Sequence, residues 1–207
     1  MRPSEVVQEW AASRLIAMSR QFFFFDQPRR FVVGTVGQPG ERVFYLQAAD
    51  DSRIVSVALE KSQVLVLAER LEQLLTEVAT RSGFEVPEAV APDTEPLENP
   101  IDEEFRVAAM GLAYDTDSGL IVVEAQAPAE SAEEAEASLL EDIEDGPDAL
   151  RVRLAHQAAV DFVERARRVI AAGRPPCPLC NEPLDPAGHV CPRSNGYRRQ
   201  VRLGSGD

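Results

Sequence analysis

The residues best suited to chemistry lie near the end of the chain, where Cys177, Cys180, His189 and Cys191 are close in sequence. They include all three cysteines and one of the two histidines. A Cys-x-x-Cys pair places two thiolates on one tight turn, whose following backbone N–H groups point at the sulfurs. A histidine and a third cysteine can then complete a tetrahedron. This spacing predicts a structural zinc site with the ligands Cys177, Cys180, His189 and Cys191.

Two alternatives to zinc stay open, a redox pair and thiols that hold no ligand. A thioredoxin-type pair opens a helix after a buried strand. Here the pair follows an expected helix end at Ala171–Gly173 and precedes proline-rich turns. If all four residues bind, the ion has no open position for water, so its role would be structural.

Elsewhere the sequence predicts no catalytic residues. His156 has no nucleophile that can be assigned to it, and the stretch Asp115–Gly119 lacks the later ligands of a calcium loop. The leading hypothesis is therefore a zinc-binding adaptor or protein-binding module that is not an enzyme. One alternative is nucleic-acid binding through the zinc knuckle and the arginine-rich tail. Another is an enzyme that acts on a phosphorylated small molecule in a cleft between two repeats.

Charge is distributed unevenly over a chain whose net charge is −14. From Arg151 onward there are ten basic and five acidic residues, whereas the preceding part has eleven basic and thirty acidic residues. Arg193, Tyr197, Arg198 and Arg199 form a basic, partly aromatic tail that could contact an anion or nucleic acid. The alternative is that this tail docks on the acidic body, the common fate of surface charges.

The cysteine pattern and the hydropathy both indicate a cytoplasmic protein. A secreted disulfide framework would spread an even number of cysteines through the fold, whereas here three are clustered. Polar residues interrupt the apolar residues near the N-terminus, so the continuous apolar region of a signal peptide is missing. No apolar run approaches the roughly 20 residues of a membrane helix. We therefore expect a protein partner and no membrane insertion.

The body of the chain predicts an α+β fold built from two β-β-β-α pseudo-repeats with antiparallel sheet, followed by the zinc knuckle. Alternating apolar residues predict the first strands and a 3.6-residue period predicts the helix after them. The expected elements of this half are strands at Phe22–Phe25, Phe31–Val36, Val43–Ala48 and Ile54–Leu59 and a helix from Lys61 to Ser82. Gly83 is expected to end the helix in a left-handed conformation.

A second set of elements follows a stretch rich in proline and acidic residues. Strands are expected at Phe105–Tyr114, Leu120–Ala127 and Leu150–Leu154, with a helix from Gln157 to Ala171. The apolar positions of the two helices coincide when the first is shifted by 95 residues, which favours an internal repeat. Any two amphipathic helices that follow strands could match in phase, and that alternative stays open.

These elements divide the chain into five parts. Residues 1–17 are an N-terminal helical extension, either a docking helix or an upstream segment that precedes an alternative start at Met18. The other expected parts are the first β-β-β-α unit at 18–86, a linker at 87–102, the second unit at 103–173 with an acidic insert at 128–147, and the zinc knuckle with its basic tail at 174–207. The insert is expected to be a solvated loop or a short exposed helix.

Several motifs resemble those of one known family. They are Met18–Gln21, Phe22–Asp26, Gly34–Gly40, Phe44–Ala48, Cys177–Cys180, Gly188–Arg193 and Asn195–Arg199. Together they are similar to the actinobacterial domain of unknown function 3090 family, from residue 18 to about residue 200. Asn181 departs from the glycine expected after the Cys-x-x-Cys pair. The resemblance implies genes beside a histidine-phosphatase-like and a lipid-kinase-like protein, and it implies no activity.

Overall fold

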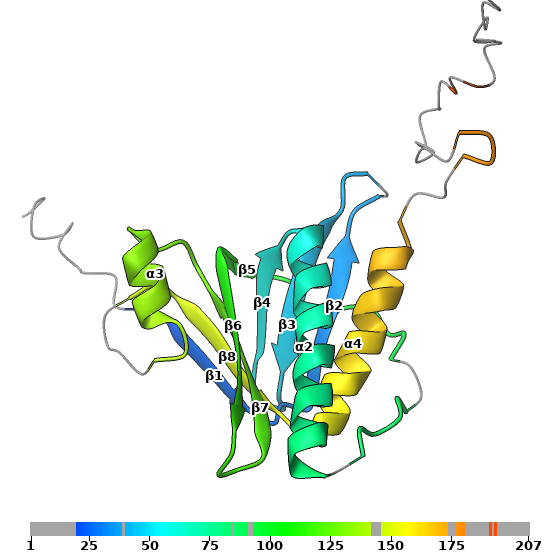
Figure 1. The fold of residues 1–207 in the computed structure, drawn as a ribbon. Helices are drawn as coiled ribbons and strands as arrows, with labels where there is room; N and C mark the ends of the chain where they lie inside the picture. Colours follow the sequence, from blue (N-terminus) through cyan, green and yellow to red (C-terminus); the bar gives the residue numbers. More distant parts are fainter. Residues whose placement is uncertain are drawn as a thin grey trace, which may run out of the picture.

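A computed structural model describes residues 20–38, 40–83, 85–90, 93–141, 146–173, 177–180, 191 and 193. These residues form two four-stranded sheets and three helices, so the α+β class is confirmed (Figure 1). The helical extension expected at 1–17 lies outside the described residues.

Each sheet combines three antiparallel strands with one parallel edge strand. Sheet A has the order β1 (Phe22–Asp26), β8 (Ala149–Leu154), β7 (Leu120–Gln126) and β6 (Ala109–Asp115). Sheet B has the order β2 (Arg30–Val36), β3 (Val43–Ala49), β4 (Ile54–Leu59) and β5 (Glu103–Arg106). The antiparallel meanders β2-β3-β4 and β6-β7-β8 correspond to the expected strands.

The parallel strands cross between the halves. We placed β1 with the first meander, but it pairs with β8, and β5 pairs with β4. The single strand expected at Phe105–Tyr114 is therefore two strands. The change of sheet takes place between neighbouring residues, because the Val107 N–H donates to Ala58 O (2.7 Å) and the Ala108 N–H donates to Gln126 O (2.8 Å). The large apolar residues that face the core change phase here, from Phe105 and Val107 to Met110 and Leu112, and the predicted single strand overlooked this break in the alternation.

Two long helices cover the inward faces of the sheets. They are α2 (Lys61–Ser82) and α4 (His156–Ala171), which run antiparallel and side by side (Figure 1). The predicted apolar stripe of α2 is buried apart from Leu74, which is partly buried. Gly83 ends α2 with a φ of 71°, as expected. The apolar residues of both sheets and both helices form one core.

The two meanders have the same register. In sheet B, Val33 lies opposite Leu46 and Leu46 opposite Val57. In sheet A the corresponding row is Leu112, Val123 and Val152. Each helix begins two residues after the last strand of its meander. Arg167 of α4 and Glu72 of α2, which are 95 residues apart and so occupy matching helix positions, form an ion pair with each other. This symmetry supports the repeat, which at the level of sequence stays a prediction.

Segments without long helices cover the outward faces. Across sheet B runs the stretch 93–98, here called the strap, whose Leu97 is buried against Gly34. Sheet A is covered by part of the acidic insert, which contains the short helix α3 (Ala132–Ser138). Within 128–147 the prediction of a short helix is thus met, although Ser138 at its end is buried.

Candidate metal centre

The segment 177–180 lies beyond the C-terminal end of α4 (Figure 1), and its two cysteines come together with Cys191. Cys177, Cys180 and Cys191 place their Sγ atoms within 4.8 Å of one another. The Sγ atoms of Cys177 and Cys191 are 3.8 Å apart, and both residues are buried. The turn at 178–180 brings together the two thiols of the Cys-x-x-Cys pair. These three residues can hold a metal ion.

The backbone of this turn favours the thiolate form. The N–H groups of Cys180 and Leu179 point at the Cys177 sulfur and lower the pKa of this thiol to about 6, with smaller contributions from the other two thiols. Hydrogen bonds to the charged form of a group stabilise that form. The thiolate is the form of cysteine that binds a metal. The N–H groups that point at the Cys177 sulfur are the arrangement expected from the Cys-x-x-Cys motif.

The distance between two of the sulfurs can be compared with that in a tetrahedral metal site and with that in a disulfide. Zinc–sulfur bonds of about 2.3 Å in a tetrahedron place neighbouring sulfurs about 3.8 Å apart. The Cys177–Cys191 separation of 3.8 Å has this value, and a disulfide would require about 2.05 Å. The three described thiols are therefore close enough to hold one metal ion, and one pair of them has the spacing of two tetrahedral ligands. His189, the predicted fourth ligand, lies outside the described residues.

The basic tail meets the metal centre at one described position. Arg193 donates from Nη1 to the carbonyl oxygen of Leu179 (2.9 Å), which lies between the first two cysteines. This arginine therefore braces the turn, in addition to any contact with an anion. Tyr197, Arg198 and Arg199 lie outside the described residues.

The chain was compared with known families, curated proteins and solved structures. Residues 23–191 match the family described as "Protein of unknown function (DUF3090)". The chain belongs to this family. No curated protein and no solved structure matches it. The matched stretch starts in β1 and ends at Cys191, so the family includes both the two-sheet body and the cysteine cluster.

The body of this family member contains a second polar site that the sequence did not predict. Asp93 of the strap accepts hydrogen bonds from Arg30 Nε (2.8 Å) and Arg165 Nη1 (2.7 Å). Arg165 also donates to Val33 O and Glu95 O, and Arg168 donates to Asp93 O. The hydrogen bond from Arg30 holds the pKa of Asp93 below its ordinary value. The arginines of this cluster thus donate their hydrogen bonds to carbonyl and carboxylate oxygens of the strap.

A signal for this site was present in the helix. Arg165 lies three residues after Phe162 and one before Ala166, among the buried positions of α4. An arginine on the apolar face of a helix requires partners, because charged side chains are almost never buried unpaired. Burial lowers the pKa of Arg165, while Asp93 acts in the opposite direction. What sequence could not supply is that the expected linker provides the partner.

None of the helices in the described part of the chain has the length and apolar character needed to span a bilayer.

Proposed function

We propose that this protein is a zinc-containing, non-enzymatic module that binds a protein partner through its C-terminal knuckle. The observation that carries the proposal is the cluster of three thiols at the spacing of a tetrahedral site. With His189 as the fourth ligand, zinc would be saturated and would stabilise a segment too short to have its own core. The residues that hold the ion would be Cys177, Cys180, His189 and Cys191.

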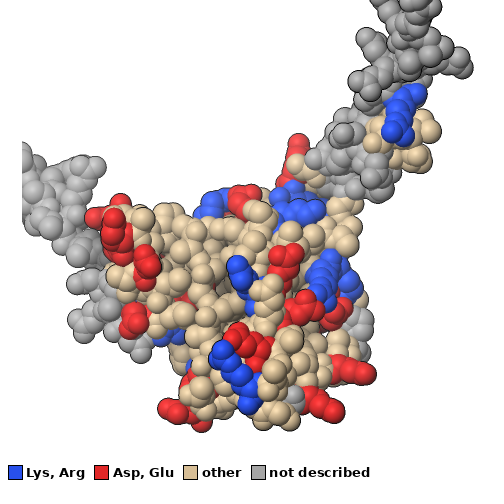
Figure 2. All heavy atoms as spheres, viewed as in Figure 1, with Lys and Arg blue, Asp and Glu red and all other residues tan. Residues whose placement is uncertain are grey.

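The surroundings of the cysteines support a binding role. Leu179 lies between two ligands and is 52% exposed, so metal binding would fix an apolar side chain at the surface. The arginines that converge on Asp93 are already hydrogen-bonded to the strap. In an open catalytic cleft such groups would instead be available to a substrate. On the face that carries α2 and α4, basic and acidic residues are interspersed without a continuous basic surface (Figure 2). Protein recognition therefore has more support than nucleic-acid binding or phosphoryl chemistry.

Metal analysis of the untagged, reduced protein tests the first half of the proposal. We expect about one zinc per chain in the wild type and a strong loss in Cys177→Ser, because a structural site requires all its ligands. Leu179→Ala is the matched control, since it changes the same turn without removing a ligand. Absence of near-stoichiometric zinc from the wild type would refute the assignment.

Partner capture from the native host tests the second half. Wild type, Cys177→Ser and Leu179→Ala are compared by quantitative mass spectrometry. A partner that is lost with Cys177→Ser and weakened with Leu179→Ala, while Leu179→Ala retains zinc, would place binding on the knuckle surface. If every captured partner were retained by both variants, the proposal would be contradicted. Enrichment of RNA that disappears in Arg198→Ala/Arg199→Ala would favour nucleic-acid binding instead.

A further inference from the structure

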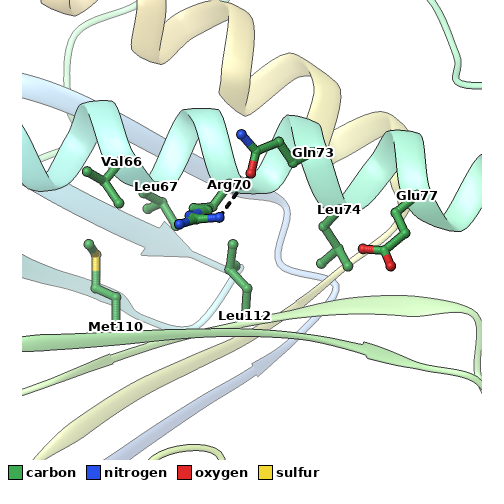
Figure 3. Close-up of a pocket in the computed structure, with 8 residues that line it drawn as sticks. All are labelled: Val66, Leu67, Arg70, Gln73, Leu74, Glu77, Met110 and Leu112. Carbon is green, nitrogen blue, oxygen red and sulfur yellow. Dashed lines mark hydrogen bonds between the residues drawn. The ribbon is translucent and has the colours of Figure 1, made fainter.

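An open groove lies between α2 and the edge strand β6. Its volume is about 360 Å³, and its lining includes Val66, Leu67, Arg70, Leu74, Met110 and Leu112. Met110 and Leu112 point from β6 toward the helix, and the Arg70 guanidinium lies above them (Figure 3). In the described part of the chain no strand pairs with the outer edge of β6. The groove therefore combines an unpaired strand edge, an apolar floor and one cation.

This groove has a counterpart in the other half of the molecule. The shared register places Leu112 of β6 at the position of Val33 in β2. The 95-residue relation between the helices places Arg70 of α2 at the position of Arg165 in α4. By the same relations Met110 and Leu67 match Phe31 and Phe162, whose rings stack at 4.9 Å. Helix α2 contacts β6 as α4 contacts β2, but less extensively.

The counterpart groove is filled, and its contents show how such a groove is used. Arg165 donates from Nε to Val33 O (2.8 Å) at the strand edge and from Nη2 to Glu95 O (2.7 Å) in the strap. Its Nη1 atom binds both the carbonyl and the carboxylate of Asp93. A segment without regular secondary structure, which carries one key carboxylate, thus lies beside the edge strand, and a helix arginine holds it there.

Differences between the grooves define what would fit the open one. Asp161 of α4, which accepts a hydrogen bond from the Val90 N–H, corresponds to Val66 of α2, which is 48% exposed. Arg168 corresponds to Gln73, and Arg30 of β2 corresponds to Ala109 of β6. Three arginines hold the strap, and only one of them, Arg165, has a basic counterpart in the open groove, which is Arg70. Glu77, at the end of the open groove, is paired with Arg81. The ligand of the open groove should therefore be more apolar than the strap and carry a single carboxylate.

We propose that this groove binds an extended segment of a partner protein, with one carboxylate on Arg70 and apolar side chains against Met110, Leu112 and Leu74. Addition of an extended peptide beside an exposed sheet edge is an established mode of recognition. The inference goes beyond the proposed function, because it concerns a second contact with a protein segment. It places the contact on the body, away from the cysteines.

Methionine methyl NMR offers a direct test. Met110 is the one groove methionine, and Met1 and Met18 serve as internal references. The probe is the capped hexapeptide Pro-Asp-Val-Val-Pro-Leu, which is the strap sequence from residue 92 to residue 97 with Thr94→Val and Glu95→Val. We expect the Met110 methyl signal, assigned with Met110→Leu, to shift with a dissociation constant of about 1 mM. The references should not move.

Variants decide whether the shift reports the proposed contact. Arg70→Ala should weaken binding about ten-fold or more, as should Asn in place of the peptide aspartate, because a charge-assisted hydrogen bond is lost. Lys61→Ala, on the same helix but outside the groove lining, should bind normally. Equal thermal midpoints would show that Arg70→Ala is folded.

Three results would overturn the inference: no Met110 shift at about 5 mM peptide, equal binding by Arg70→Ala, or a Met110 shift that depends on protein concentration without peptide, which would indicate a second copy of the chain. Peptide binding should be the same in Cys177→Ser. Failure of the zinc site and failure of this groove are therefore distinguishable.

Discussion

On the outward face of sheet B the buried polar pair is Gln47 and Ser56, and at the matching positions of sheet A it is Glu124 and Arg151. Gln47 donates to Ser56 Oγ (3.0 Å) and binds both backbone groups of Glu98. The neutral pair thereby anchors the strap to the sheet.

The charged pair does the same for the acidic insert. Glu124 accepts hydrogen bonds from Arg151 and from the Leu140 N–H (3.2 Å), and Arg151 donates to Glu141 O (3.0 Å). In both sheets the covering segment buries backbone groups that need partners. The requirement at this position is therefore for hydrogen bonds, which either a carboxamide or an ion pair can provide. The neutral pair and the charged pair differ in what remains when one partner is removed: a buried neutral group in sheet B and a buried charge in sheet A.

The largest effect is expected from removal of the buried carboxylate. Glu124→Ala should lower the free energy of unfolding by about 3–5 kcal/mol, because Arg151 is left buried with an uncompensated charge. Gln47→Ala should cost about 1–3 kcal/mol, since only neutral groups lose their partner. Urea denaturation of the two variants measures both values. Equal losses would show that the ion pair is no more demanding than the carboxamide.

Substitution of the glycines beneath the covering segments should have an intermediate effect. A Cβ atom on Gly34 would lie 2.6 Å from Leu97 Cγ, and one on Gly111 would lie 2.9 Å from Leu139 Cγ. We expect Gly34→Ala and Gly111→Ala each to destabilise by about 1–3 kcal/mol through overpacking, with the greater loss at Gly34. Thermal unfolding reports the order. Adding Leu97→Ala should relieve Gly34→Ala and leave Gly111→Ala unchanged, whereas relief of both would refute a local clash.

A smaller effect is expected from exchanging the chemistry of the sheets. Glu124→Gln combined with Arg151→Ser rebuilds in sheet A the residue types of sheet B. This double variant should be more stable than Glu124→Gln alone by about 1–2 kcal/mol, because the guanidinium that has lost its buried Glu124 carboxylate is gone. The double-mutant cycle in urea gives the coupling. Additive losses would mean that the two side chains do not act as a pair.

The smallest effect concerns pH and the strap. The pKa of Asp93 is lowered in the folded protein, first by the hydrogen bond from Arg30. Its contribution is therefore fully present above the ordinary aspartate pKa of about 3.9 and is lost as pH falls through the lower folded-state value. The stability difference between wild type and Asp93→Asn, measured in urea, should shrink between pH 6 and pH 3. The exposed Thr94→Val change, which removes no ionisable group from the strap, should show no such trend, and a constant difference for Asp93→Asn would contradict this account.

Local features of the fold could be predicted from sequence, whereas long-range pairings could not. The stripe of α2 and the left-handed Gly83 follow from periods and residue types within a few positions. The choice of β8 as the neighbour of β1 depends on contacts across the whole chain. Both candidate neighbours offer apolar strands, so the pattern of Phe22–Phe25 does not distinguish them.

The cysteine site and the polar clusters differ in the same way. The three candidate metal ligands are close in sequence, so their spacing alone suggests a metal site. Glu124 interrupts an apolar strand and Arg165 an apolar helix face, and both mark a need for partners without naming them. The partners, Arg151 and Asp93, lie in other elements and required a structure.

The exchange of β1 and β5 between the sheets has a consequence for synthesis on the ribosome. The Gln21 N–H donates to the Asp148 carboxylate, a contact between residues that are 127 positions apart. The first strand therefore emerges long before β8, its only strand neighbour in the sheet. Throughout that interval the run of four phenylalanines lacks the strand with which it pairs in the folded protein. Long-range pairing slows folding and exposes apolar strands to aggregation, so nascent chains shorter than about 150 residues should depend on chaperones.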